Sequence, residues 1–151
     1  MITFQVEPWS SFKTEAASLW PKHWEEVAIN KDKIKLNVDF RQFDAIDSVG
    51  QLIVVVGRED GEVVGYWVGF VRPHLHYADS LTAYTDVYFV DPAYRRPRVA
   101  WRLFKAVEKE LKRRGVQKVF TATKLHLDHS RLFASLGYTE TERLFTKMLE
   151  D

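Results

Sequence analysis

An arginine-rich turn joins an apolar strand to an amphipathic helix between residues 81 and 114. Residues 81–90 have the β-branched and aromatic content of a strand, and residues 99–114 carry apolar side chains at helical spacing. The turn between them contains Arg95, Arg96 and Arg98. A helix N-terminus presents unpaired N–H groups and partial positive charge, and guanidinium groups add further donors. The segment therefore predicts a chain of alternating strands and helices, with an anion site where this strand meets this helix.

The net charge of +1 conceals a strongly basic segment. Residues 91–115 contain nine Lys or Arg and three acidic residues, a local balance of +6 that leaves −5 for the rest of the chain. A basic element in a mildly acidic body indicates a localised anionic ligand rather than a protein that coats DNA. The cations in the last turns of the helix, residues 109–114, are explained by its dipole and a solvated face.

Length and composition narrow the class of protein. A chain of 151 residues with 46% hydrophobic and 14% aromatic residues can bury a substantial core, and we expect a single domain over residues 1–151. There is no cysteine, which excludes disulfides, thiolate catalysis and thiolate metal sites. No apolar run is long enough to span a membrane, and Met1–Glu7 is typical of a strand rather than a signal peptide. We therefore expect a cytoplasmic protein with no membrane partner.

Hydrophobic periodicity predicts strands and helices along nearly the whole chain. The expected strands are residues 2–6, 52–56, 63–71, 81–90, 116–123 and 138–149. The expected helices are residues 10–20, which Pro21 would end, 24–29, 99–114 and 128–136. Residues 31–50 have no clean period and residues 72–80 are expected to form a loop. The pattern predicts a mixed central sheet with helices on its faces, in the α/β (α+β) class.

The order of elements and the arginine-rich turn resemble the GNAT acyltransferase superfamily. Members carry an Arg/Gln-x-x-Gly-x-Gly/Ala signature between the fourth strand and the next helix, and here that position reads Arg95-Arg96-Pro97-Arg98-Val99-Ala100. A Tyr-x-x-x-Gly-Phe pattern near the family's carboxyl end appears as Phe133-Ala134-Ser135-Leu136-Gly137-Tyr138. With the strand order, the likeness covers nearly the whole chain. It implies a GNAT-like, mostly antiparallel sheet of six to seven strands flanked by about four helices.

The resemblance implies acetyl-coenzyme A (acetyl-CoA) as co-substrate, with its pyrophosphate at the turn and its pantetheine arm along the preceding strand. Arg98 stands where the family has its first glycine, and Pro97 lacks an N–H group that the turn would otherwise offer. We expect the Arg96 and Arg98 side chains to compensate. The residues expected to bind the cofactor are Phe89, Val90, Arg95, Arg96, Arg98, Val99 and Ala100.

Transfer of an acetyl group to an amine requires a base, because an alkyl ammonium group has a pKa of about 10.4. Asp86 is the only carboxylate within residues 81–90, and strand alternation places Tyr84 on the same face. Asp86 is therefore the candidate base, with Tyr84 in a supporting role. A carboxylate that pairs structurally or faces solvent is the alternative.

The departing thiolate also needs a proton, and Phe133 occupies the place where the family often has a tyrosine donor. His126, His129, Tyr88 and Tyr138 are the candidate substitutes, and a histidine suits proton exchange near neutral pH. His129 lies at the start of the next expected helix, and capping or packing is the alternative for it. His126 stands where many relatives have an asparagine close to the cofactor. Transfer without an acid is the alternative.

The function implied by the resemblance is an N-acetyltransferase that uses acetyl-CoA to modify a primary amine of a small molecule or a protein. The acidic residues Asp39, Asp44 and Asp47 favour a cationic acceptor, although a solvated acidic loop explains them equally. The alternative function is a non-catalytic acyl-CoA-binding or nucleic-acid-binding module with a degenerate GNAT site. We expect no metal site, since His74 and His76 lack a matching ligand pattern. Whether the chain is a monomer or a homodimer stays open.

Overall fold

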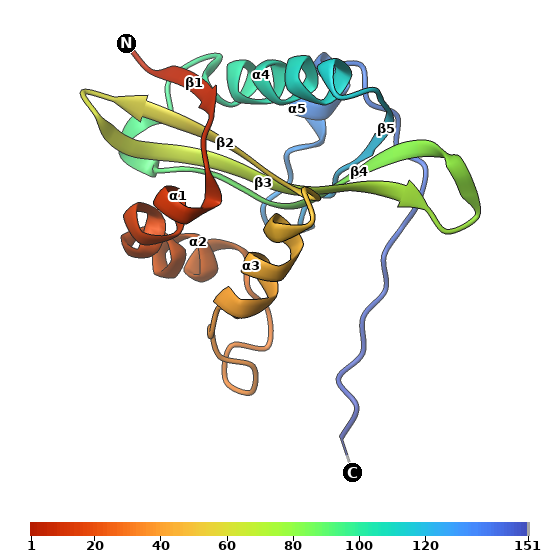
Figure 1. Ribbon diagram of the computed structural model, residues 1–151. Coiled ribbons are helices and arrows are strands. Elements are labelled where there is room, and N and C mark those ends of the chain that lie inside the picture. Colours follow the sequence, from red (N-terminus) through yellow and green to blue (C-terminus); the bar gives the residue numbers. More distant parts are fainter. Residues whose placement is uncertain (151) are drawn as a thin grey trace.

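The computed structural model describes residues 1–150 and contains one five-stranded sheet between two layers of helices (Figure 1). The strands lie in the order β1-β2-β3-β4-β5, with neighbours antiparallel except for the parallel pair β4 and β5. The strands are β1 (Thr3–Val6), β2 (Leu52–Glu59), β3 (Glu62–His74), β4 (Tyr77–Val90) and β5 (Val116–Phe120). The α-helices are α1 (Trp9–Glu15), α2 (Trp20–Val27), α3 (Phe40–Ser48), α4 (Val99–Arg113) and α5 (Ser130–Ser135). Short 3₁₀ turns span Ala16–Ser18 and Pro92–Tyr94.

The sheet has a hydrophobic core on each face. Helices α1, α2 and α3 cover one face, and α4 and α5 cover the other (Figure 1). Strand β2 is buried from Leu52 to Gly57, because Val54 and Val56 face the first layer while Ile53 and Val55 face the second. This double burial explains why β2 reads as a continuous apolar run rather than an alternating one.

A β-bulge interrupts β4 at Asp86. On β3, Val68 pairs with Val87 and Gly69 pairs with Thr85, so Asp86 has no partner in the ladder. As a result Ala83 and Tyr88, five residues apart, both pack into the α4 and α5 core. A bulge adds one residue to a strand and redirects the side chains around it, often beside a functional site.

Strands β4 and β5 separate after a short parallel pairing. Their ladder runs only from Leu81 with Val116 to Tyr84 with Phe120, although β4 continues to Val90. Beyond Tyr84 the edge of β4 that faces β5 has no strand partner among the described residues. The two strands therefore separate beyond this pair of residues. We call the region between them the β4–β5 opening.

The structure corrects several expectations from the sequence. Pro21 lies in the first turn of α2 rather than ending the preceding helix, which suits its fixed φ and missing N–H. Residues 31–50 contain α3, whose N-cap Asp39 accepts a hydrogen bond from the Gln42 N–H at 3.1 Å. Residues 72–80 continue the β3–β4 hairpin instead of forming a loop, apart from a turn at Leu75 and His76. The structure therefore has five α-helices where about four were expected.

The expected sheet of six to seven strands is also wrong, because the described chain forms five. Strand β5 ends at Phe120, short of the expected residue 123. Residues 138–149, expected to be a closing strand, join no sheet. A strand requires a partner for its backbone groups, and within residues 1–150 the segment after Tyr138 makes no backbone-to-backbone hydrogen bond.

Candidate active site

The turn between β4 and α4 is shaped by Asp91. Its carboxylate accepts hydrogen bonds from the Ala93 N–H at 3.0 Å and from Lys22 Nζ at 2.7 Å. The Lys22 contact, with help from the Ala93 N–H, lowers the pKa of the Asp91 carboxyl. The side chain therefore stays ionised, closes the Pro92–Tyr94 turn and ties it to α2.

Arg98 adopts the left-handed conformation at the N-cap of α4, with φ of 70° and ψ of −2°. Glycine occupies this conformation without strain, whereas residues with a Cβ atom adopt it at a cost of about 1–2 kcal/mol. Arg98 occupies the place of the first glycine in the GNAT signature. The backbone thus keeps the conformation that favours glycine, although the side chain differs.

The start of α4 presents free hydrogen-bond donors. Val99 donates its N–H to the Arg96 carbonyl at 3.2 Å, and Arg102 donates to the Arg98 carbonyl at 2.8 Å. Across residues 1–150 the N–H groups of Arg98, Ala100 and Trp101 have no acceptor. These groups, with the helix dipole, form a place that can receive an anion such as a phosphate.

Two of the three arginines of the turn are bound to carboxylates. Arg95 Nη2 donates to both oxygens of Glu26 at 2.7 and 2.6 Å, and its Nε donates to the Val90 carbonyl at 2.8 Å. Arg96 donates to Glu59 at 3.1 and 2.8 Å, and this contact lowers the pKa of the Glu59 carboxyl. Arg98 pairs with no carboxylate within residues 1–150, and its guanidinium lies 5.9 Å from the Trp101 ring centroid. Of the side chains expected to bind phosphate, Arg98 is therefore the one without a charged partner in the described chain.

The end of β4 combines a buried side chain with an open backbone edge. Phe89 is buried and its ring stacks on His23, with centroids 5.0 Å apart. Val90 uses its carbonyl to hold Arg95. Phe89 and Val90 lie beyond the β4–β5 pairing, where β4 can offer main-chain groups to an extended ligand.

Asp86, the candidate base, lies at the bulge, and the residue is exposed to solvent. The surrounding protein nevertheless desolvates its carboxylate, and this raises the pKa of Asp86. No cation within residues 1–150 pairs with it. A carboxylate with a raised pKa and no ion-pair partner has the properties of a general base.

Tyr84 is held on the side of the sheet that carries Phe70 and Arg72. Its ring stacks on Phe120, with centroids 5.2 Å apart and planes at 6°, and the Arg72 guanidinium lies 5.6 Å from its centroid. The bulge at Asp86 interrupts the simple alternation of side chains between Tyr84 and Asp86, so their position on one face stays a prediction.

Residues after β5 contact Tyr88, which lies on β4 beyond its pairing with β5. The Tyr88 hydroxyl donates to the Ala122 carbonyl at 2.9 Å and lies 3.1 Å from His129 Nδ1. Since a hydroxyl has one proton, the Nδ1–H of His129 donates to Tyr88. Burial raises the pKa of Tyr88 and lowers that of His129. His126 donates from Nε2 to the Glu26 carbonyl at 2.8 Å.

The other tyrosine proposed as a proton donor is placed differently. Tyr138 packs against Phe133, with ring centroids 5.6 Å apart, and its buried hydroxyl has no partner among the described residues. Burial raises the pKa of Tyr138 to about 12. Tyr88 lies 5.7 Å from Phe133 between ring centroids and has its hydroxyl at the β4–β5 opening, so it is better placed to replace the missing family tyrosine.

Helix α2 contributes residues that the sequence did not single out. Lys22 pairs with Asp91 and Glu26 pairs with Arg95, so two ion pairs of opposite order join α2 to the turn. Lys22 and Glu26 are four residues apart in α2, and Asp91 and Arg95 are four residues apart in the turn. This matching spacing of opposite charges is the sequence signal that could have revealed the contact. His23 Nδ1 lies 2.9 Å from the Tyr66 hydroxyl, and burial lowers the pKa of His23 to about 4.

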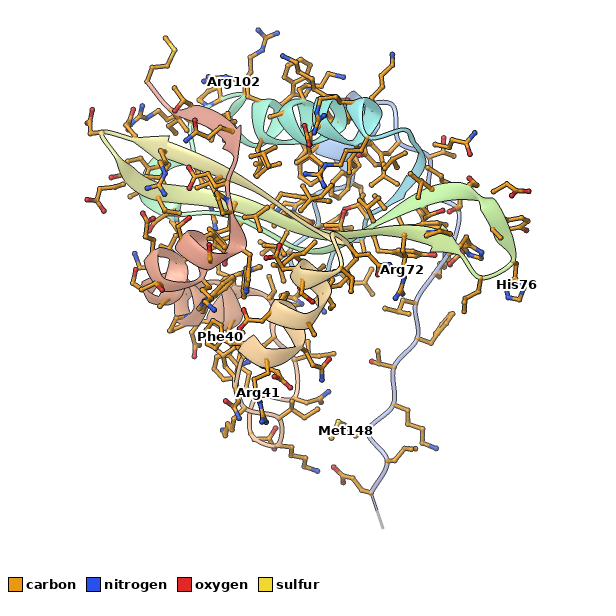
Figure 2. All side chains as sticks on the ribbon, in the orientation of Figure 1. Phe40, Arg41, Arg72, His76, Arg102 and Met148 are labelled. Carbon is orange, nitrogen blue, oxygen red and sulfur yellow. The ribbon has the colours of Figure 1, made fainter. Side chains whose placement is uncertain are left out.

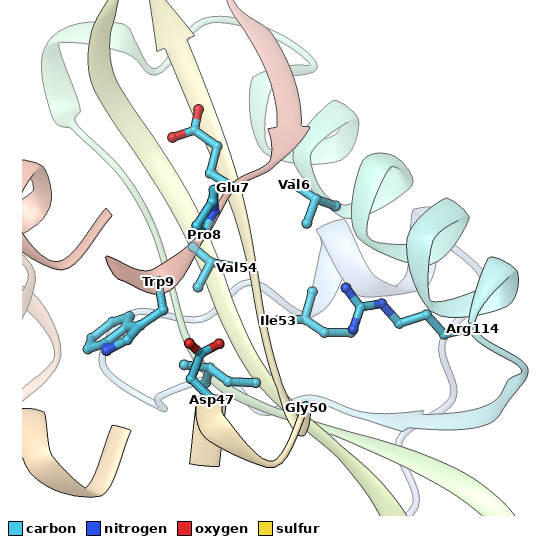
Figure 3. Close-up of a pocket in the computed structure, with 10 residues that line it drawn as sticks. Val6, Glu7, Pro8, Trp9, Asp47, Gly50, Ile53, Val54 and Arg114 are labelled. Carbon is cyan, nitrogen blue, oxygen red and sulfur yellow. The ribbon is translucent and has the colours of Figure 1, made fainter. Parts of the chain in front are cut away.

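The acidic residues of the irregular segment have local partners. Asp39 caps α3, and Asp44 accepts hydrogen bonds from Trp9 Nε1 at 2.7 Å and from Lys13 Nζ at 3.0 Å. Asp47 lines a hollow of about 410 Å³ beside β1 and β2, together with Glu7 and Arg114 (Figure 3). This hollow lies at the opposite edge of the sheet from the β4–β5 opening. The structure thus gives Asp39 and Asp44 structural roles.

Residues 1–150 contain neither a cluster of metal ligands nor a helix that could cross a membrane. No group of three or more His, Asp or Glu side chains there could hold a metal ion. No helix within those described residues is long and apolar enough to cross a membrane.

Residues 9–138 match the Acetyltransferase (GNAT) family, and the chain therefore belongs to that family. No curated protein sequence matches the chain. An aminoglycoside acetyltransferase from an uncultured soil metagenomic sample, solved with sisomicin, is similar in structure with a TM-score of 0.75. It is 16% identical, and the alignment covers 99% of this chain and 97% of that one.

Two further structures have the same fold. A predicted acetyltransferase from Clostridium acetobutylicum, solved with acetyl-CoA, has a TM-score of 0.71 and 15% identity over 98% of this chain and 96% of that one. Glucosamine-6-phosphate N-acetyltransferase from Arabidopsis thaliana has a TM-score of 0.70 and 14% identity over 98% and 99%. At these identities the likeness establishes the fold, and the acceptor of this chain is a separate question.

Proposed function

We propose that this GNAT protein is an N-acetyltransferase that transfers the acetyl group of acetyl-CoA to a primary amine. The main support is the start of α4, where Arg98 has a left-handed conformation that favours glycine and three N–H groups lack acceptors in the described chain. These donors follow the open end of β4 after the Pro92–Tyr94 turn. Together they fit a ligand with a pyrophosphate joined to an extended arm.

The N–H groups of Arg98, Ala100 and Trp101 would hold the pyrophosphate, with the Arg98 guanidinium beside them. The backbone of Phe89 and Val90 would pair with the amides of the pantetheine arm in the β4–β5 opening. Arg95 and Arg96 would act by fixing the turn, since both are committed to carboxylates. Acetyl-CoA, when bound, supplies an acetyl group activated as a thioester.

Asp86 would take the proton of the attacking amine, directly or through a water molecule. Its desolvated carboxylate has a raised pKa, which makes it a stronger base than an ordinary aspartate. Tyr84 would line the same region with its stacked ring. The Tyr88 hydroxyl would return a proton to the thiolate, since it lies in the opening beside the phenylalanine that replaces the family tyrosine.

The contacts of His126 fit a role in positioning the loop after β5. Its Nε2–H donates to the Glu26 carbonyl, so Nδ1 is the nitrogen that can accept a hydrogen bond. The residue therefore connects the loop after β5 to α2 next to the cofactor turn. We keep His126 as a candidate site residue, with positioning of the loop as its contribution.

The acceptor we propose is a small molecule or protein with a primary amine. Among proteins of this fold, one was solved with the aminoglycoside sisomicin, and another is a ribosomal-protein-alanine N-acetyltransferase from Brucella melitensis. Two of the three aspartates that favoured a cationic acceptor have local partners, since Asp39 caps α3 and Asp44 binds Lys13. Asp86 is the acidic group closest in sequence to the β4–β5 opening and would attract a cationic amine.

Calorimetric titration with acetyl-CoA tests the cofactor site. We expect micromolar binding that weakens about tenfold in Ala100→Pro, because proline removes one N–H yet fits the first turn of a helix. Arg41→Pro, in the first turn of α3, is the matched control and should bind as the unmodified protein does (Figure 2). Absence of binding at low millimolar acetyl-CoA would disprove the proposal.

Thiol release across a panel of amines tests catalysis. We expect release that depends on an amine and falls strongly in Asp86→Asn, while Asp60→Asn in the β2–β3 turn leaves the rate unchanged. Binding of acetyl-CoA with no thiol release for any amine would favour the non-catalytic alternative. A nucleic-acid partner would instead show binding that falls steeply between low and moderate salt.

A further inference from the structure

Three aromatic side chains form one row across β3, β4 and β5. Phe70 pairs with Tyr84 in the β3–β4 ladder, and Tyr84 pairs with Phe120 in the β4–β5 ladder. Phe70 packs against the core under α1 to α3, and paired residues share a face, so the row lies on that side of the sheet. The Tyr84 and Phe120 rings stack with centroids 5.2 Å apart and planes at 6°. Because these two residues are the last pair of the β4–β5 ladder, the row borders the β4–β5 opening.

Two cations flank the stacked pair. In the neighbouring row, Arg72 of β3 and Lys118 of β5 both pair with Thr82 of β4, and strand alternation places them on the same face as the aromatic rings. The Arg72 guanidinium lies 5.6 Å from the Tyr84 ring centroid. The Lys118 Nζ lies 4.9 Å from the Phe120 ring centroid. One charged group therefore lies beside each of the two rings.

Both cations are exposed and have no acidic partner in the described chain. Neither Arg72 nor Lys118 forms an ion pair or a side-chain hydrogen bond within residues 1–150. Figure 2 shows the Arg72 side chain on the same side of the sheet as α3. The Tyr84 hydroxyl also lacks a hydrogen-bond partner among these residues, and it is not buried. Two unpaired like charges on one small surface attract an anion, and the hydroxyl adds a further donor.

This surface lies beside the candidate base. Asp86 follows Tyr84 by two residues along β4, which is about 7 Å at the rise of a strand. An acceptor whose amine reaches Asp86 can therefore place a second group about 7 Å away, beside the two cations. In an extended chain that distance corresponds to about two residues, or six bonds.

We propose that Arg72 and Lys118 form an acceptor subsite for the anionic group of a small molecule that joins a primary amine to a carboxylate or a phosphate. The inference rests on the proposed N-acetyltransferase function and names the class of its acceptor. A guanidinium and an ammonium group bind either anion through charge-assisted hydrogen bonds. Tyr84 and Phe120 would contact the apolar chain between the amine and the anion. A second cation on the acceptor would be repelled at this position.

Amines of matched length test the subsite. Thiol release is measured for 6-aminohexanoate, hexylamine and 1,6-diaminohexane, and we expect kcat/KM to fall in that order. The three differ only in the charge at the end remote from the reacting amine. With 4-aminobutyl phosphate as a fourth substrate, the anionic amine that reacts faster identifies the bound group as a carboxylate or a phosphate.

Variants test whether the two cations cause this order. Arg72→Gln combined with Lys118→Gln should lower kcat/KM for 6-aminohexanoate about tenfold, mainly through KM, and lower it far less for hexylamine. Arg72→Glu should shift the preference toward 1,6-diaminohexane. Lys109→Gln combined with Lys112→Gln is the matched control, because it removes the same charge from exposed positions of α4 on the other side of the sheet. This control should keep the order and the rates of the unmodified protein.

Two kinds of failure are distinguishable. The subsite is overturned, with the N-acetyltransferase function intact, when hexylamine or 1,6-diaminohexane reacts faster than both anionic amines in the unmodified protein. A preference for the anionic amines that survives the double glutamine variant overturns it equally. Absence of thiol release for every amine tested, although acetyl-CoA binds, overturns the proposed function and the subsite together. The order of the amines in the unmodified protein decides the question even if a variant folds poorly.

Discussion

Arg95 donates from Nη2 to both carboxylate oxygens of Glu26, at 2.7 and 2.6 Å, across 69 residues of sequence. Its Nε donates to the Val90 carbonyl, and its guanidinium lies 5.6 Å from the Phe89 ring centroid. These contacts join the end of β4, the cofactor turn and α2. The first residue of the GNAT signature is therefore placed to act as a brace for the turn rather than as a direct phosphate ligand.

Removing either partner of this brace should weaken acetyl-CoA binding to a similar degree. We expect Glu26→Gln, Arg95→Gln and the double variant to lose affinity about equally, because each disconnects the same link. For folding, the coupling between the two partly exposed groups should be about 0.2–1 kcal/mol and should fall with salt. Calorimetry and urea unfolding of the four proteins measure both. A far larger loss of affinity in Arg95→Gln alone would indicate a direct phosphate contact instead.

Arg98→Gly should stabilise the protein while weakening coenzyme binding. The left-handed φ of 70° disfavours a Cβ atom, and its removal should raise the free energy of unfolding by about 0.5–1 kcal/mol. Binding should weaken because the guanidinium without a carboxylate partner in the described chain is lost. Urea unfolding and calorimetry measure the two effects. Arg98→Val should destabilise the fold, since a β-branched residue fits this conformation worst.

Asp86→Asn should lower the rate of transfer and yet raise stability near neutral pH. Loss of a general base typically costs about 10²–10⁴-fold in rate. Burial raises the pKa of Asp86, so the native state holds its proton to higher pH than the unfolded chain does. The contribution of Asp86 to the free energy of unfolding is therefore fully present below the ordinary aspartate pKa of about 3.9. This contribution is lost as pH rises through the raised pKa of the native state. Thermal unfolding at pH 5 and pH 8 should show the variant's advantage growing with pH, and an equal or lower stability at pH 8 would contradict this.

His23 should make the fold sensitive to mild acid. Burial lowers the pKa of His23 to about 4, whereas the unfolded residue titrates near 6.5. Between these two pKa values the unfolded chain has a protonated His23 and the native state a neutral one. The free energy of unfolding therefore has its full value above pH 6.5 and declines as pH falls toward 4, by about 3 kcal/mol in all. His23→Asn should remove this part of the pH dependence in urea unfolding between pH 7 and pH 5. His76→Asn, at the exposed hairpin tip, is the control and should behave as the unmodified protein does.

The sequence was sufficient where neighbouring residues decide the structure. The apolar run of β2, the strand and helix around the arginine-rich turn, and the start of α4 at Val99 all follow from local periodicity. The anion site expected at the turn rests on its charge and its position before a helix, which the sequence shows, and it stays a prediction. The family assignment followed from the same segment and was confirmed by the match over residues 9–138.

Only the tertiary structure could decide which partner each charged or polar group has. Arg95 meets Glu26 and Lys22 meets Asp91 across 69 residues, and Tyr88 meets His129 across 41, separations that no local pattern encodes. The bulge at Asp86 depends on how β4 pairs with β3, which alternation in the sequence does not show. The segment after Tyr138 has the composition of a strand but no partner in its own described chain, because strand formation requires an edge to bind and not only a suitable sequence.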